Sequence, residues 1–259
     1  MSLCLRIIGT GKPLVLLHGW GLNSGVFDHV ARALADRYTC HLIDLPGFGE
    51  NASQPMTNLN DVAQQLVEVI PQGSVVLGWS LGGLVATQLA LAHPKHVSKL
   101  IVVASSPKFQ AEPAAAQESG WPGIAPKVLQ AFEVQLEQDY HSTLQRFMAI
   151  QAMGSPTAKA DILALRDAIE AYPPPCEASL LQGLSWLSSI DMRSDLKAIT
   201  QPTLRIYGRL DALVPQAAVT AIQVLQPAAK TVIMEHVSHA PFMTNLSEFN
   251  AEVIDFIEN

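Results

Sequence analysis

Cysteine is scarce in this sequence, and the copies present are widely separated. The three cysteines are odd in number and stand at Cys4, Cys40 and Cys176 in a chain of 259 residues. A disulfide framework uses paired cysteines, and a structural zinc site uses ligands that are a few residues apart. The spacing therefore predicts neither kind of site and indicates a reducing compartment.

Basic residues are outnumbered, and long apolar runs are missing. Lysine and arginine total 16 against 23 acidic residues, for a formal net charge of -7. Proteins that bind nucleic acid carry a basic face, so this balance argues against that class. A membrane helix needs about 20 apolar residues in a row, and a secretory signal needs a basic start followed by an apolar stretch. Because neither pattern is present, we expect a cytoplasmic protein with no membrane partner, and the acidic balance predicts no nucleic-acid partner. A monomer is also expected.

Short apolar segments alternate with helical periodicities along most of the chain. An edge strand is predicted at residues 3–8, and buried strands are predicted at 14–17, 40–43, 75–77, 100–104, 203–207 and 231–234. Amphipathic helices are predicted at 27–38, 59–70, 84–92, 218–225 and 246–257. Strands that alternate with helices form a parallel sheet covered on both faces. The expected fold class is therefore α/β, with a mostly parallel central sheet flanked by helices.

The pattern changes between residues 109 and 190, where strand signals give way to four helical periodicities. Pro156 and the prolines at 173–175 separate these segments, because proline cannot continue a helix interior. We interpret residues 109–190 as an inserted helical cap of about four helices. The core domain then comprises residues 1–108 and 191–259.

The stretch SVVLGWSLGG at residues 74–83 carries the most specific local pattern. Gly78, Ser80 and Gly82 form G-x-S-x-G, which is typical of a nucleophile elbow when a strand precedes it and a helix follows. A predicted strand and a predicted helix flank it here. Ser80 is therefore the predicted nucleophile, held on a sharp and strained turn.

A serine nucleophile needs a base and a group that orients the base, and this kind of sheet places them in the chain order serine, acid, histidine. Asp211 and His239 each follow a predicted strand, in that order. We prefer Asp211 as the acid over Asp191 and Asp195, which precede a helix; a turn or helix-cap role is the alternative for Asp211. His236 is the competing base, and we prefer His239 because His236 adjoins the strand end.

Acyl transfer also needs NH donors that stabilise an oxyanion. Leu81, at the helix start, is one predicted donor. Trp20 is the other, because the glycines that flank it in HGWG allow close backbone approach. His18 is expected to tie this loop by hydrogen bonds rather than to react. Residues 44–49 lack the lysine and the spacing of a phosphate loop and are expected to form a tight turn, so no cofactor or metal is predicted.

Taken together, five motifs resemble those of the α/β-hydrolase superfamily along the whole chain: HGWG, DLPGFG, GWSLGG, YGRLDALVP and SHAPF. Within that superfamily, HGWGLN, GWSLGGLVA, VASSP, WPGI at Trp121 and RFMAIQ at Arg146 resemble the pimeloyl-acyl-carrier-protein methyl ester esterases of biotin synthesis. WPGI and RFMAIQ lie in the cap, where generic hydrolases diverge, and they carry most of this specificity. The resemblance implies the α/β-hydrolase fold.

The resemblance further implies a serine carboxylesterase that cleaves the methyl ester of a carrier-bound pimeloyl chain and releases methanol. Ser80 would attack the ester, His239 would move the proton, Asp211 would orient His239, and the NH groups of Trp20 and Leu81 would hold the oxyanion. Besides Trp20, Ser80, Leu81 and His239, the implied substrate contacts are Phe147, Met148, Ala149, Ile150 and Gln151. Plain helix packing is the alternative role for part of this cap segment.

The family docks its acidic carrier protein on basic cap residues, here Arg146, Lys159 and Arg166. Residues 109–190 depart from this pattern, because they contain nine acidic and four basic side chains and are net acidic by five. Docking then requires the basic residues to cluster on one face, since local potential steers association. Ordinary solvated helix faces are the alternative role for these charges.

Two other functions stay open. A general short-chain carboxylesterase or a carbon-carbon bond hydrolase would use the same three residues on a free small molecule. A non-catalytic small-molecule receptor would keep the fold, although the complete set of serine, acid and histidine argues against that class.

Overall fold

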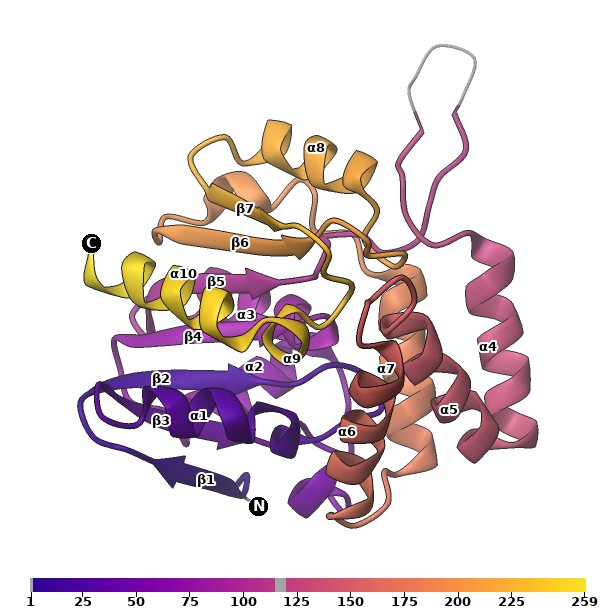
Figure 1. The fold of residues 1–259 in the computed structure, drawn as a ribbon, viewed down its shortest axis with the longest axis horizontal. Helices are drawn as coiled ribbons and strands as arrows, with labels where there is room; N and C mark the ends of the chain where they lie inside the picture. The colour runs from indigo at the N-terminus through magenta and orange to yellow at the C-terminus, as the bar shows by residue number, and fades with distance from the viewer. Residues whose placement is uncertain (1, 115–119) are drawn as a thin grey trace.

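The computed structural model describes residues 2–114 and 120–259. Within this part of the chain, seven strands form one sheet in the order β1-β3-β2-β4-β5-β6-β7 (Figure 1). Strand β1 pairs with β3 in antiparallel fashion, and the other pairs are parallel. The strands are β1 (Leu5–Ile8), β2 (Lys12–Leu17), β3 (Tyr38–Ile43), β4 (Ser74–Trp79), β5 (Val97–Val103), β6 (Thr203–Gly208) and β7 (Lys230–Met234).

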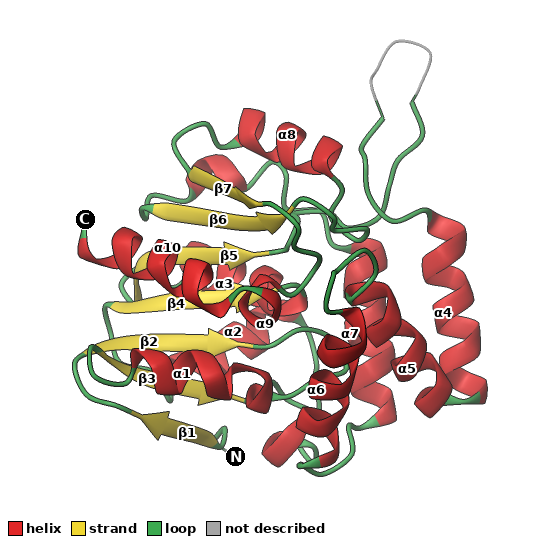
Figure 2. Ribbon diagram, viewed as in Figure 1, coloured by secondary structure: helices red, strands yellow, loops and turns green. Residues whose placement is uncertain are grey.

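Helices cover both faces of the sheet (Figure 2). Helices α1 and α10 pack on one face, against strand residues such as Leu14, Leu16 and Leu77. Helices α2, α3 and α8 pack on the other face, against residues such as Val15 and Val76. Strands buried on both faces read as continuous apolar runs, which explains the runs seen in the sequence. The core helices are α1 (Asp28–Leu34), α2 (Leu59–Val67), α3 (Leu81–Ala92), α8 (Gln216–Leu225), α9 (Pro241–Thr244) and α10 (Leu246–Glu258), with short 3-10 helices η1 (Ser24–Phe27), η2 (Gly49–Asn51) and η3 (Leu196–Ala198).

The chain between β5 and β6 contributes four helices within the described residues: α4 (Pro126–Gln138), α5 (Tyr140–Gln151), α6 (Ala158–Glu170) and α7 (Glu177–Ser189). They gather beyond the carboxyl ends of the parallel strands (Figure 1). Asp139 begins α5, because its side chain accepts a hydrogen bond from the backbone N–H of Ser142 at 3.1 Å. This position places the inserted helices over the sheet edge where α/β proteins bind ligands.

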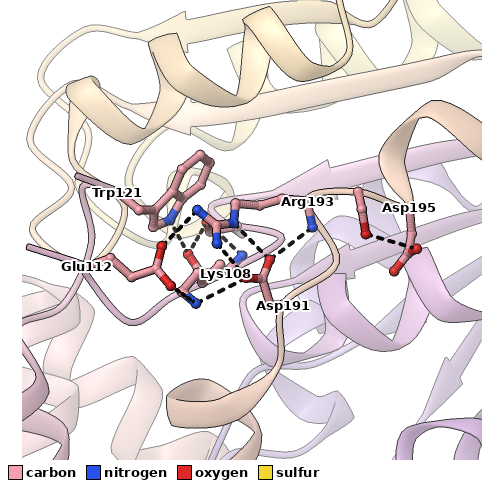
Figure 3. Close-up of polar contacts among 8 residues, drawn as sticks. Lys108, Glu112, Trp121, Asp191, Arg193 and Asp195 are labelled. Carbon is pink, nitrogen blue, oxygen red and sulfur yellow. Dashed lines mark hydrogen bonds and ion pairs between the residues drawn. The ribbon is translucent and has the colours of Figure 1, made fainter. Parts of the chain in front are cut away.

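An ionic cluster joins the two segments that connect these helices to the sheet (Figure 3). Lys108 Nζ lies 2.6 Å from the Glu112 carboxylate and 3.1 Å from that of Asp191. Arg193 lies 2.9 Å from Glu112 and 2.6 Å from Asp191, with its guanidinium over the Trp121 ring. The indole N–H of Trp121 donates to the carbonyl of Lys108 at 2.8 Å. We call these five residues the junction cluster.

The α/β fold, the mostly parallel sheet and the four inserted helices are confirmed. Helix α1 is shorter than the helix predicted at 27–38, because the chain turns at residues 35–37 before β3 begins at Tyr38. Helix α9 was not predicted. That residues 109–190 act as a cap distinct from the core is our proposal. Of the helices in residues 2–114 and 120–259, none has the length and apolar character that crossing a bilayer requires.

Candidate active site

Ser80 lies between the end of β4 and the start of α3, in a backbone conformation that non-glycine residues rarely adopt. Its φ is 54° and its ψ is -117°. Glycine is required on both sides, because a Cβ on Gly78 would lie 2.1 Å from the carbonyl oxygen of Gly82. A Cβ on Gly82 would lie 2.3 Å from the carbonyl oxygen of Leu17. The G-x-S-x-G spacing thus allows a strand and a helix to meet at the serine.

The structure brings Ser80, His239 and Asp211 together. His239 Nε2 lies 2.9 Å from Ser80 Oγ, and His239 Nδ1 lies 2.8 Å from Asp211 Oδ2. The other carboxylate oxygen of Asp211 accepts the backbone N–H groups of Leu213 at 2.8 Å and Val214 at 3.0 Å. The Ser80 and His239 side chains are buried, at 2% and 0% exposure. This geometry is that of a nucleophile, its base and an orienting acid.

The backbone of His239 is fixed at both of its polar groups. The indole N–H of Trp79 donates to the carbonyl of His239 at 2.8 Å. The backbone N–H of His239 donates to the carbonyl of Gln151, at the end of α5, at 3.2 Å. The backbone of His239 is therefore held by the end of β4 on one side and by the inserted helices on the other.

The competing candidates lie elsewhere. His236 is exposed, on a left-handed turn with φ of 58°, whereas His239 faces Ser80. Asp191 belongs to the junction cluster, and Asp195 precedes η3. His18 Nδ1 donates to the carbonyl of Gly19, and its Nε2 accepts the N–H of Leu45, which requires a neutral ring. Burial lowers the pKa of His18, in agreement with its expected structural role.

The 44–49 stretch is the tight turn that its sequence predicts. The Asp44 carboxylate accepts the backbone N–H groups of Ser24 at 2.6 Å and Glu50 at 2.9 Å. Gly47 and Gly49 both have positive φ, at 86° and 50°. The aspartate therefore holds two loops together.

The 18–21 loop passes directly beside the nucleophile. A Cβ on Gly19 would lie 3.3 Å from Ser80 Cβ, so this position favours glycine. Within the described residues, the backbone N–H groups of Trp20 and Leu81 donate to no backbone carbonyl in the loops and turns. The Trp20 ring is held by α7, since its indole N–H donates to the carbonyl of Leu180 at 2.8 Å. Trp20 and Leu81 as oxyanion donors stay a prediction that this geometry permits.

Some of the implied substrate residues on α5 lie near the catalytic residues, and others do not. The Phe147 ring meets the Trp20 ring edge to face at 4.8 Å, and Met148 is buried in the core cluster that contains Trp79. Gln151 is buried beside His239, and its Oε1 has no hydrogen-bond partner within the described residues. Ile150 is partly buried against the core cluster that contains Trp20 and Phe147, whereas Ala149 is exposed on the opposite side of the helix. The structure therefore brings Phe147, Met148 and Gln151 towards the site but not Ala149.

The three basic docking candidates do not share one set of contacts. Arg146 is turned towards α4, where it donates to Gln135 Oε1 at 3.0 Å and lies over the Phe132 ring. Arg166 lines a groove of about 220 Å³ on α5 and α6, with Met148 also in its wall. Lys159 is exposed at the start of α6. Glu118, counted among the acidic residues of this segment, lies outside the described residues.

In the described part of the chain, no three His, Cys, Asp or Glu side chains lie close enough together to bind a metal ion. The reactive groups that the site does offer are a serine hydroxyl, an imidazole and a buried carboxylate. Together they can carry out acyl transfer through a covalent intermediate.

A comparison with known protein families identifies the same fold. A family model described as the alpha/beta hydrolase fold matches residues 12–246. The chain belongs to the α/β-hydrolase family. It is a serine hydrolase.

Several proteins similar to this α/β hydrolase are named as esterases. A protein of Vibrio cholerae serotype O1 named pimeloyl-[acyl-carrier protein] methyl ester esterase is 46% identical over 99% of this chain and 98% of its own. A protein of the same name from Aeromonas hydrophila subsp. hydrophila is 45% identical over 98% of each chain. An esterase from Exiguobacterium antarcticum is similar in fold, with a TM-score of 0.84 over 98% of this chain and 95% of its own, at 24% identity.

One part of this hydrolase's site was missed by reasoning from the sequence. The end of α5 touches the histidine loop, where Ser238 Oγ lies 2.9 Å from the carbonyl oxygen of Gln151 and 2.8 Å from that of Met153, so that its one proton is shared between them. The available signal was a small hydroxyl residue directly before the predicted base. Its partners are more than 80 residues away in the chain, so the sequence alone could not identify them.

Proposed function

We propose that this α/β hydrolase cleaves the methyl ester of pimeloyl-acyl-carrier protein, giving pimeloyl-acyl-carrier protein and methanol. The observation that carries the proposal is the 46% identity, over nearly the whole length of both chains, to an esterase named for this substrate. The hydrogen-bonded series Ser80, His239 and Asp211 supports it, because ester hydrolysis needs these three groups in this order.

The reaction would proceed in two acyl transfers. Ser80 Oγ attacks the ester carbonyl carbon while His239 Nε2 takes the hydroxyl proton, and Asp211 holds the imidazole in the required tautomer. The N–H groups of Trp20 and Leu81 stabilise the oxyanion. When the bond to the methoxy group breaks, His239 returns the proton and methanol leaves. Water then attacks the acyl-serine, with His239 again as the base, and the free acid departs on its carrier.

The covering helices would supply the selectivity for the acyl chain. The Ser80 and His239 side chains are almost fully buried, so an ester reaches them after the covering residues move. Phe147 and Met148 lie in this cover and would contact the methylene chain. The carrier protein would dock outside on Arg146, Lys159 and Arg166, although the contacts of Arg146 and Arg166 differ.

Two measurements test the proposal. The first is growth without biotin of a strain that lacks this esterase and carries either the wild-type gene or the Ser80→Ala variant. We expect growth with wild type and none with Ser80→Ala at equal protein level. The second compares kcat/KM for carrier-bound methyl pimeloyl ester with that for free dimethyl pimelate. Preference for the free ester, together with failure to restore growth, would instead identify a general carboxylesterase.

A further inference from the structure

The carboxyl end of α5 is bound to the loop that carries the histidine. Carbonyl groups in the last turn of a helix lack intrahelical partners and need donors from elsewhere. The carbonyl of Gln151 accepts two such donors, the backbone N–H of His239 at 3.2 Å and Ser238 Oγ at 2.9 Å. The Ser238 hydroxyl also lies 2.8 Å from the carbonyl of Met153. Ser238 is 1% exposed, so water does not compete for these contacts.

These contacts act directly on the peptide groups of His239. Its N–H is held by Gln151, and its carbonyl is held by Trp79. The direction of the imidazole depends on this backbone, because a histidine ring is joined to it by two rotatable bonds. A shift of the Gln151 carbonyl would therefore turn the Nε2 atom relative to Ser80 Oγ.

We propose that Ser238 is a positioning residue for the base: its hydroxyl fixes the end of α5 against His239, so that the imidazole is aligned with Ser80 while the inserted helices are closed. The inference rests on the proposed function, in which His239 takes the proton from Ser80. It adds that the helices that select the substrate also align the base. Movement of α5 away from the core breaks both bonds to Gln151 and loosens the base.

Ser238 is not the sole contact between the inserted helices and the core within the described residues, because α6 also binds α9. The buried Asp161 carboxylate, at the start of α6, accepts from Ser155 Oγ at 2.6 Å and from Thr244 Oγ1 of α9 at 3.2 Å. Thr244 lies five residues beyond the histidine and does not touch it. Thr244→Val therefore provides a matched control, which removes a contact between the inserted helices and the core without touching the peptide groups of His239.

The experiment measures steady-state hydrolysis of p-nitrophenyl acetate by wild type and by Ser238→Ala, Ser238→Cys, Ser238→Thr and Thr244→Val. This ester is too short to need the acyl-chain contacts on α5. All rates are taken about 15 °C below the lowest melting temperature of the set, so that loss of folded protein does not contribute. Ser238→Cys keeps the side-chain volume but donates weakly, and it replaces Ser238→Ala if that variant does not fold.

We expect Ser238→Ala and Ser238→Cys to lower kcat about 3- to 10-fold with KM unchanged, as loss of one orienting hydrogen bond predicts. Ser238→Thr keeps the donor and should stay within about twofold of wild type. Thr244→Val should lower the melting temperature and leave kcat unchanged. Wild-type kcat in Ser238→Ala and Ser238→Cys, or an equal fall in Thr244→Val, would overturn the inference alone. Inactive wild type that also fails to react with a fluorophosphonate would overturn both this inference and the proposed function.

Discussion

The chemistry of this protein depends on a few side chains that the chain holds under strain or out of water. Ser80 keeps a positive φ of 54° although it has a Cβ, and such strain persists where the surrounding structure enforces it. His239 and Asp211 are buried and bonded to each other at 2.8 Å. The groups are therefore pre-arranged before an ester arrives, which is how a weak nucleophile becomes effective.

At this scale we predict that Ser80→Ala and His239→Ala lose similar and large factors of activity, at least about 10³-fold in kcat, because triad members act as a unit. His236→Ala is the matched control, since that histidine is exposed and three residues away. Fluorophosphonate labelling, with circular dichroism as the check on folding, measures the outcome. Loss of labelling in His236→Ala with retention in His239→Ala would reverse the assignment of the base.

At the scale of the structural elements, the junction cluster should make the stability of the folded protein depend on pH. Hydrogen bonds from Arg193, and then from Lys108, hold the pKa of Asp191 below its usual range, against the opposing effect of partial burial. A carboxylate whose pKa is depressed in the folded state contributes stability above its unfolded pKa, about 3.9, and loses that contribution as pH falls towards the folded value. The cluster should therefore support the junction at neutral pH and weaken in acid.

We predict that Asp191→Asn lowers the melting temperature at pH 7, and that its difference from wild type shrinks as the pH falls below about 4. Glu235→Gln is the control, because its pair with Arg209 is exposed and lies away from the junction. Thermal melts at a series of pH values measure the effect. A difference between wild type and Asp191→Asn that stays constant from neutral to acid pH would contradict the pKa assignment.

The elements also show what a sequence can and cannot predict. The strands were predictable, because burial on both faces leaves a continuous apolar run, and the inserted helices were predictable, because burial of one face leaves a helical period. Ser80, Asp211 and His239 were predictable, because glycines mark the elbow and each partner follows a strand. Contacts between distant segments leave no pattern in the sequence. Examples are the hydrogen bond of Ser238 to Met153 and the ion pair of Arg193 with Glu112, whose partners are far apart in the chain. The unpredicted α9 is four residues long, too short for a periodic signal.

For the whole molecule, the proposed function requires this acidic protein to bind the acidic carrier protein that the family resemblance implies. The formal net charge is -7, which disfavours encounter between two acidic partners at long range. Local potential can still guide docking over about 8 Å, the screening length at physiological salt. Lys159 and Arg166 both belong to α6, and Arg166 borders the groove whose wall includes Met148. We propose that a carrier approaches the buried serine along this helix, where it would compete with Glu170, 3.7 Å from the Arg166 guanidinium.

We predict that the double variant Lys159→Glu with Arg166→Glu raises KM for the carrier-bound ester about tenfold at low salt and leaves kinetics on a free methyl ester unchanged. Added salt should shrink the difference, because exposed charges are screened. Arg32→Glu, on α1 of the core, is the matched control of equal charge per site. Equal effects on both esters would indicate disturbed folding of α6. No effect on either ester would show that the carrier does not dock on α6.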